Sequence, residues 1–285
     1  MSRPVSPHVA IVTDSTAYLP LAQRERHRIH AVPLTVVLGD EALEEGTEIS
    51  ARSLAAALRE RRPVTTSRPS PETFAQAYRA AAEDGADGIV SLHLSAEFSG
   101  TYDAAVLAAR EAPVPVRVVD TGVVAMALGF CALAAAETAE AGGSLDDAVA
   151  AAEKRAEGTS AYFYVDTLDY LRRGGRIGAA QALLGSALAV KPLLELDEGR
   201  IGLLEKVRTA SKAIARLEEI VVEHAGDATV DIAVHHLAAP ERAEQLSERL
   251  RERVPDLREL HVSEVGAVIG AHTGPGLLGA VVSRR

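Results

Sequence analysis

The sequence is poor in the residue types that build disulfides and aromatic surfaces. Among its 285 residues it has one cysteine, Cys131, no tryptophan, and only 4% aromatic residues. A single cysteine excludes an intramolecular disulfide and fits a reducing compartment. Cys131 lies in the apolar stretch VAMALGFCALAAA. We therefore expect a buried, unreactive thiol.

Positive charge is also scarce. The sequence has 30 lysines and arginines against 40 acidic residues, a net charge of −10. This balance argues against broad binding to nucleic acids or to anionic membranes, which attract basic surfaces. No secretory signal is visible, and the longest nearly uncharged segment, Gly178–Val190, is too short to span a bilayer. The expected location is the cytoplasm.

Several standard motifs are missing or misplaced. GPGLLG at residues 274–279 has the form G-x-G-x-x-G, but it lacks the helix, second strand and acidic residue that a dinucleotide-binding unit needs. Neither a phosphate loop of the form G-x-x-x-x-G-K-[ST] nor a G-x-S-x-G nucleophile motif occurs. His235 and His236 would point to opposite faces of a strand, so we expect no metal site.

The first half of the chain repeats strands and helices. Apolar runs at His8–Thr13, Ala31–Leu38, Gly88–Leu94 and Val116–Asp120 predict strands of a parallel sheet. Ser50 is expected to cap one helix. Ser70, followed by Pro71, is expected to cap another. Residues 1–158 therefore predict an α/β domain with a mostly parallel sheet flanked by helices.

The second half is less regular. After Gly158-Thr159-Ser160, which has the composition of a linker, the pattern predicts a helix at Ala179–Val190. It also predicts a hairpin whose turn is Asp197-Glu198-Gly199. A hairpin between strands requires a mixed or antiparallel sheet. Residues 159–285 therefore predict an α+β domain with a mixed sheet.

Three loops are rich in hydroxyl groups: Thr13–Thr16, Thr65–Ser70, and the stretch SLHLSAEFSGTYDAA that begins at Ser91. The third has hydroxyls and backbone N–H groups at a helix start but no lysine or arginine. It could hold a small anion by hydrogen bonds alone. Three such loops on one sheet edge predict a binding crevice. For Ser95, Ser99 and Thr101, helix capping and ligand contact both remain open.

His272 and two groups of basic residues complete the candidates. His272, in AHTGPG, is expected in a loop, either as a surface residue or, because glycines allow close approach, lining a site. Two basic clusters either cap helix ends or dock an acidic protein partner. They are Arg172, Arg173 and Arg176, and then Lys206, Arg208 and Lys212.

The ordered motifs resemble the DegV family from about residue 9 to 283. These are bacterial fatty-acid-binding proteins that serve as the lipid-carrying subunit of fatty acid kinase. The motifs are VTDST, TTSRPS, HLSAEFSGTYDAA, VVDT, LDYLRRGGRI, VKPLLELDEGRI, KVRT and GAHTGPG. The resemblance implies two domains that enclose a long-chain fatty acid between them, with no catalysis, cofactor or metal of the protein's own. A separate kinase, using its own ATP and Mg²⁺, would convert the carboxylate to an acyl phosphate.

The resemblance also implies roles for particular residues. Thr66 and Ser99 would hydrogen-bond the carboxylate, with Ser95, Gly100 and His272 close to it. Arg173, Arg176 and Arg208 match positions linked with docking of the kinase. Arg68 departs from the family, which usually has glutamine there. It would add an ion pair to the head group only if it points inward.

Two further expectations concern the tail and a rival activity. Val123–Leu133 and Ala179–Val190 are apolar enough to line an acyl chain, although most of those residues also suit an ordinary core. The alternative function is a serine hydrolase or acyltransferase with Ser99 as nucleophile and His272 as base. An acyl-enzyme at Ser99 would distinguish it from lipid binding.

Overall fold

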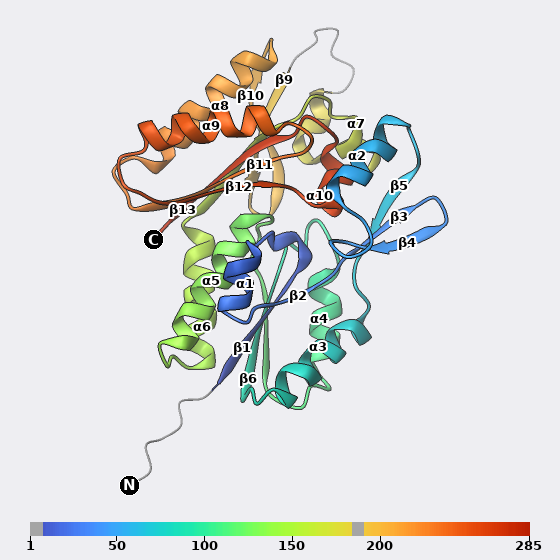
Figure 1. Ribbon diagram of the computed structural model, residues 1–285, viewed down its shortest axis with the longest axis vertical. Helices are drawn as coiled ribbons and strands as arrows, with labels where there is room; N and C mark the ends of the chain where they lie inside the picture. The colour runs from blue at the N-terminus through green and yellow to red at the C-terminus, as the bar shows by residue number, and fades with distance from the viewer. Residues whose placement is uncertain (1–7, 184–190) are drawn as a thin grey trace. The chain divides into compact units, whose positions relative to one another are not determined.

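The computed structural model describes residues 8–183 and 191–285 (Figure 1). They form two compact units. One consists of the chain up to Leu34 together with Arg68–Glu157, and the other of Thr35–Ser67 together with Gly158–Arg285. The chain therefore passes from one unit to the other three times.

The first unit is built on a four-stranded sheet. Its strands are β1 (Val9–Asp14), β2 (His30–Val32), β6 (Gly88–His93) and β7 (Val116–Asp120). They lie in the order β2-β1-β6-β7, and every neighbouring pair is parallel. The expected parallel sheet is confirmed. Because the carboxyl ends of parallel strands lie at one edge, the loops after β1, β6 and β7 lie on the same edge of this sheet.

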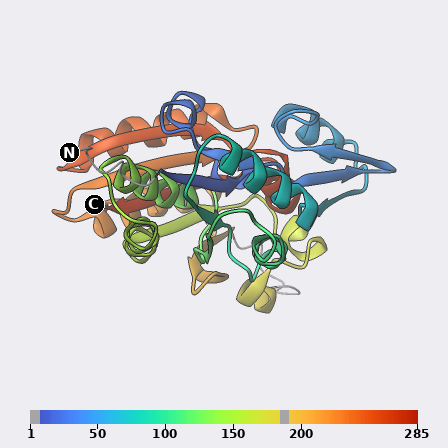
Figure 2. The same cartoon turned by 90° about the horizontal axis from the view of Figure 1, so that it is seen from below.

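Helices cover both faces of this sheet. Figure 2 shows α3 (Pro71–Glu83) and α4 (Thr101–Ala109) on one side, and α5 (Met126–Glu140) and α6 (Leu145–Glu157) on the other. All six residues of β6 are buried. Since side chains alternate along a strand, Ile89, Ser91 and His93 face α3 and α4. A short 3₁₀ helix (Ser15–Ala17) and α1 (Leu21–Arg26) link β1 to β2.

The second unit contains a six-stranded mixed sheet in the order β10-β9-β8-β13-β11-β12. Its strands are β8 (Thr159–Tyr164), β9 (Lys191–Asp197), β10 (Arg200–Val207), β11 (Val230–His236), β12 (Leu257–Glu264) and β13 (Leu278–Arg284). Only β11 and β12 pair in parallel; the other neighbours are antiparallel. The expected mixed sheet and the hairpin of β9 and β10 are confirmed.

Two long helices cover this mixed sheet. Figure 1 shows α8 (Ala210–Ala225) and α9 (Pro240–Arg253) side by side along it. Leu217 and Val221 of α8 and Leu246 of α9 belong to one buried apolar cluster with residues of the sheet. The short helices α7 (Asp169–Arg173) and α10 (Ala267–Thr273) contact each other in the same unit.

The segment Thr35–Ser67 belongs to the second unit, whereas the sequence analysis placed it in the first domain. It forms a three-stranded antiparallel sheet in the order β4 (Glu41–Glu44), β3 (Thr35–Leu38) and β5 (Val64–Ser67). Helix α2 (Ala51–Arg59) lies between β4 and β5 in the chain. Helix α2 packs on α10, with the buried Leu54 close to Gly270. Tertiary packing to a segment more than 200 residues away leaves no local signal in the sequence.

Two further expectations about this region were wrong. The run Ala31–Leu38 is not one strand but two, β2 and β3, in different sheets. Pro33 between them lacks the N–H that would continue a ladder. The three hydroxyl-rich loops are also not all on one sheet edge, because Thr65 and Thr66 lie within β5.

The linker expected at Gly158-Thr159-Ser160 agrees with the structure only in part. The change of unit falls at Glu157–Gly158, but Thr159 and Ser160 already belong to β8 rather than to a linker. The helix expected at Ala179–Val190 begins as a 3₁₀ helix, Gly178–Leu183, and its remainder lies outside the described residues. Ile201 O lies so close to Gly178 that a side chain there would overlap it.

The helix starts and the cysteine agree with the sequence analysis. Ser50 accepts a hydrogen bond from Ser53 N, and Ser70 accepts one from Thr73 N at 3.2 Å with Pro71 at the first helical position. Cys131 is fully buried in the apolar helix α5, and burial raises the pKa of its thiol to about 12. Val123–Leu133, considered above for tail lining, lies mostly within the core of the first unit.

A helix that crosses a membrane needs about 20 mostly apolar residues. Within residues 8–183 and 191–285, no helix is both long and apolar enough to do so.

The cap at Ser70 gives a direct test of the fold. Replacing Ser70 with alanine removes the acceptor for Thr73 N, so we expect the free energy of unfolding to fall by about 1 kcal/mol. Ser70→Asp restores a side-chain acceptor and should recover most of that loss. Urea denaturation followed by circular dichroism measures both. Equal stability of the alanine and aspartate variants would contradict the capping role.

Candidate functional site

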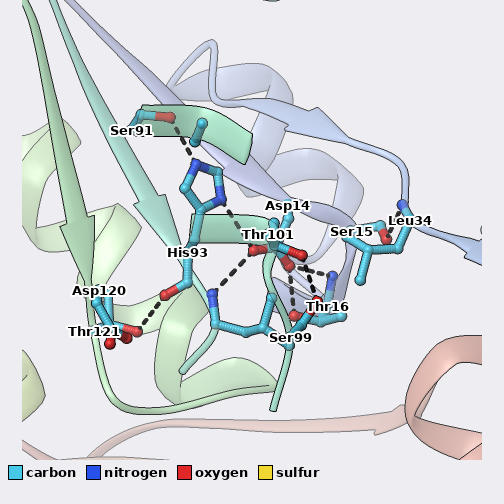
Figure 3. Close-up of polar contacts among 12 residues, drawn as sticks. Asp14, Ser15, Thr16, Leu34, Ser91, His93, Ser99, Thr101, Asp120 and Thr121 are labelled. Carbon is cyan, nitrogen blue, oxygen red and sulfur yellow. Dashed lines mark hydrogen bonds and ion pairs between the residues drawn. The ribbon is translucent and has the colours of Figure 1, made fainter. Parts of the chain in front are cut away.

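The first candidate element is the serine loop, residues 94–100, which connects β6 to α4 in the first unit. Its beginning is fixed by the buried carboxylate of Asp14, which accepts hydrogen bonds from Leu94 N at 3.0 Å and from Thr16 N at 3.1 Å (Figure 3). The carbonyl of His93 accepts one from Thr121 Oγ1 at 2.8 Å. Strands β1, β6 and β7 thus hold the start of this loop.

The serines of this loop differ in their surroundings. Ser95 is 1% exposed, and its hydroxyl accepts a hydrogen bond from Glu97 N at 3.2 Å, which is a turn-forming role. Ser99 is half-buried, and its hydroxyl lies 2.8 Å from that of the buried Thr101, the first residue of α4. Gly100 is the N-cap of α4 and provides no side-chain acceptor. Ser99 is therefore the hydroxyl of this loop best placed to meet a ligand.

Arg68 lies against the same loop. Its Nη1 donates to the carbonyl of Gly100 at 3.4 Å, and a side chain on Gly100 would overlap the guanidinium. The sequence analysis left open where Arg68 points. Within the first unit, its guanidinium lies on the serine loop at Gly100.

Behind the loop, a buried chain of polar groups links α3 to β1. Tyr78 OH donates to Ser91 Oγ at 2.9 Å. Ser91 Oγ lies 2.7 Å from His93 Nε2, and His93 Nδ1 lies 3.1 Å from Asp14 Oδ2 (Figure 3). Burial raises the pKa of Tyr78 to about 12, so its phenol keeps its proton. A consistent proton arrangement has Ser91 donating to His93, and His93 donating to Asp14.

This chain contains serine, histidine and aspartate in hydrogen-bonding order, but it is not an active site. Ser91, His93 and Asp14 are each 0% exposed. Ser91 also lies in the middle of β6, where no substrate could reach its oxygen. The sequence analysis missed the role of His93. The signal was a polar residue at alternate positions of an otherwise apolar strand, which predicts a buried partner.

The second candidate element lies in the second unit and joins Thr66 to His272. Thr66 Oγ1 of β5 is 2.8 Å from His272 Nε2 of α10. Helix α10 contacts both β3 and β5. The pairing of these two strands therefore fixes the position of Thr66 relative to the helix. The buried Glu45 accepts a hydrogen bond from Val268 N in the first turn of α10 and fixes that helix further.

His272 lies in the last turn of a helix, so its expected place in a loop was wrong. The reason is that small residues such as those in VIGAHT allow a helix when it packs tightly, here with Gly270 against Leu54 and Leu237. Burial, and then the positive charge of Arg176, lower the pKa of His272 to about 4. The ring is therefore neutral at neutral pH.

The three candidate docking arginines all belong to the second unit. Arg173 ends α7 and is exposed, with its guanidinium 5.7 Å from the centre of the Tyr170 ring. Arg176 is half-buried and its Nη1 donates to the carbonyl of Gly174 at 2.6 Å. Arg208 is exposed just before Thr209, the N-cap of α8. Arg176 thus braces a turn, while Arg173 and Arg208 present charge to solvent.

The remaining sequence motifs carry no site. GPGLLG follows α10 and leads into a strand, the reverse of a dinucleotide-binding unit. His235 bonds Ser263 while His236 lies 4.0 Å from Glu264. In the described part of the chain, no group of histidine, cysteine and acidic residues could hold a metal ion. Over the same residues, the only hydrogen-bond partner of the Ser99 side chain is a hydroxyl, that of Thr101.

Comparison with known proteins agrees with this arrangement. Residues 8–285 match a family model described as "Uncharacterised protein, DegV family". The chain is 81% identical over 281 residues to a DegV domain-containing protein of Streptomyces coelicolor, covering 99% of this chain and 100% of the relative.

Solved structures give the same result. A fatty-acid-binding DegV family protein from Thermus thermophilus superposes with a TM-score of 0.92 at 37% identity, covering 98% of this chain and 100% of that one. DegV of Bacillus subtilis, described as a fatty acid binding protein, superposes with a TM-score of 0.91 at 37% identity over the same shares. The chain therefore belongs to the DegV family.

Proposed function

We propose that this protein binds a long-chain fatty acid and presents its carboxylate to a separate ATP-dependent kinase subunit. The observation that carries the proposal is the pairing of Thr66 with a neutral, largely buried histidine in a chain of this family. Solved relatives at 37% identity are described as fatty-acid-binding proteins. An ATP-using partner would place this function in the cytoplasm.

The affinity would come mainly from the tail. An acyl chain of about 14 methylenes, at roughly 0.8 kcal/mol for each one buried, offers on the order of 11 kcal/mol before costs. Association and ordering of the chain reduce this by several kcal/mol. The head group then needs donors to replace its hydration rather than a strong ion pair. Hydroxyl groups such as those of Thr66 and Ser99 meet that need.

Hydroxyl donors also suit the reaction that would follow. In acyl-phosphate formation, a carboxylate oxygen attacks the γ-phosphorus of ATP, a new P–O bond forms, and the bond to ADP breaks. A tight ion pair would lower the reactivity of that oxygen. Hydrogen bonds from Thr66 and Ser99 orient the carboxylate and leave it nucleophilic.

The first test is mass spectrometry of the protein under native conditions after mild purification. A non-covalent mass of a long-chain fatty acid that is lost on denaturation supports the proposal. A covalent acyl adduct on Ser99 would instead support the hydrolase or acyltransferase. Protein that neither carries nor takes up fatty acids would overturn the proposal.

Variants at the two hydroxyls test the head-group assignment. Thr66→Ala and Ser99→Ala should each lower phosphorylation by the kinase subunit by roughly tenfold, the equivalent of one lost hydrogen bond to a charged group. Both should keep most of their fatty acid, because the tail supplies the affinity. Thr65→Ala is the matched control, since Thr65 is exposed on the same strand. Normal turnover of both variants would show the assignment to be wrong.

Charge reversal tests the docking of the kinase. Arg173→Glu and Arg208→Glu should raise the KM of the kinase for this protein by roughly tenfold and reduce its salt dependence, because exposed charges act mainly on encounter. Fatty-acid content should not change. Arg258→Glu, an exposed arginine of β12 in the same unit, serves as the control. An equal rise in KM for Arg258→Glu would show that the effect comes from the net charge of the protein, and it would contradict docking at Arg173 and Arg208.

A further inference from the structure

Two short helices of the second unit meet through glycines. Gly174, the C-cap of α7, lies against the His272 ring of α10, and a methyl group on Gly174 would overlap His272 Nδ1. Gly274, the C-cap of α10, lies against the Tyr170 ring of α7 in the same way. Each helix end thus packs on an aromatic side chain of the other helix.

Position 174 needs glycine because a side chain would overlap the His272 ring, and not because of its backbone conformation. Its φ of −76° and ψ of −9° lie in the right-handed helical region, which any L-residue adopts without strain. The next residue, Gly175, has a φ of +71°, which favours glycine, and a side chain there would meet nothing within 4 Å. The two glycines therefore have different roles, and that of Gly174 is contact with His272.

Arg176 holds Gly174 in this place. Its Nη1 donates to the Gly174 carbonyl at 2.6 Å, which closes the turn after α7. The same arginine is close enough to His272 to help lower its pKa. The ring of His272 is thus fixed on one side by this turn and on the other by Thr66.

The hydrogen bond between Thr66 and His272 can have either polarity, and the two differ in what they leave for a ligand. If Thr66 donates to His272 Nε2, its single hydroxyl hydrogen is used and it cannot donate to a carboxylate. If Nε2–H donates to Thr66 Oγ1, the hydroxyl hydrogen remains available.

The surroundings of Nδ1 favour the second case. This nitrogen is buried and has no hydrogen-bond partner among residues 8–183 and 191–285. A Cβ on Gly174 would overlap this nitrogen, so a C–H group of the Gly174 α-carbon faces it. A neutral ring carries one proton, and a proton on Nδ1 would be a buried donor with no acceptor, which is costly. A bare Nδ1 beside a C–H group avoids that.

We propose that Gly174 and Arg176 are positioning residues that hold His272 with its proton on Nε2, so that His272 donates to Thr66 and Thr66 donates to the ligand carboxylate. His272 then acts through Thr66 and fixes the direction of its hydroxyl. The identity of the ligand rests on the function proposed above, but the proton position does not. The turn that carries Arg173 thus packs against His272, which contacts Thr66 in the same unit.

The proton position can be read in the ligand-free protein. Two-bond ¹⁵N–¹H correlation spectra distinguish a histidine ring protonated on Nε2 from one protonated on Nδ1, with His272→Gln used to assign the signal. We expect the Nε2–H pattern for His272. Signals of an Nδ1–H ring or of a mixture of both would overturn the proposal. This result does not depend on whether the protein binds fatty acids.

Gly174→Ala tests the contact itself. Its methyl group should displace the His272 ring, change the ring's ¹⁵N pattern, and lower phosphorylation of the bound fatty acid by roughly tenfold, as expected for one lost oriented donor. Gly202→Ala is the control, because its added carbon would meet the flexible side chain of Glu195 at 3.2 Å and the Asp197 side chain at an ordinary contact distance of 3.8 Å. An unchanged His272 spectrum in Gly174→Ala would contradict the proposal.

A comparison at position 272 keeps the test independent of any folding defect at Gly174. Glutamine can donate to Thr66 from its amide, whereas alanine cannot. His272→Gln should therefore retain more kinase turnover than His272→Ala by several-fold, at equal fatty-acid content. Equal turnover of the two variants would contradict the donor role. Absence of bound fatty acid in the wild-type protein would instead refute the proposed function and leave the spectroscopic result standing.

Discussion

The first unit depends on one buried carboxylate. Asp14, the last residue of β1, is 0% exposed, yet it accepts hydrogen bonds from Thr16 N, from Leu94 N just after β6 and from the ring of His93. A buried carboxylate without hydrogen-bond donors would lower the stability of the fold by several kcal/mol. The donors of Asp14 are therefore restrained in position by this carboxylate. The same bonds fix where β6 stops and the serine loop starts. The position of Ser99 is thus a consequence of the packing around Asp14.

The two candidate elements achieve similar chemistry by different means. In the serine loop, side chains at the ends of neighbouring parallel strands hold the backbone: Asp14 and Asp120 accept from Leu94 N and Ala96 N, and Thr121 donates to the His93 carbonyl. Around Thr66, side chains from distant segments do so: Glu45 fixes α10 and Arg176 fixes the turn against His272. In both arrangements a partly buried hydroxyl group, that of Ser99 or that of Thr66, lies beside a segment fixed in this way. This suits a ligand whose charged end must be oriented without being neutralised.

Sequence reasoning succeeded where the physical cause is local. The caps at Ser50 and Ser70, the hairpin at Asp197-Glu198-Gly199 and the burial of Cys131 all follow from a few neighbouring residues. Reasoning from the residues alone failed where the cause lies far away in the chain. Pro33 indicates that the strand is interrupted, but nothing near Thr35 shows with which sheet the next strand pairs. Nothing near His272 indicates a helix that packs on Leu54. Ordered motifs predicted the family because they combine many distant positions at once.

The path of the chain has a consequence for how the protein is made. Residues 35–67 belong to the second unit, and their helix α2 packs on α10, which is synthesised some 200 residues later. At roughly 5–20 residues per second, the ribosome needs on the order of 10 to 40 s to supply that partner. The apolar face of α2, which includes Leu54 and Leu58, is therefore not buried against α10 until the end of synthesis. During translation α2 lacks its packing partner until α10 is made, so residues 35–67 are most exposed to aggregation and proteolysis in that interval.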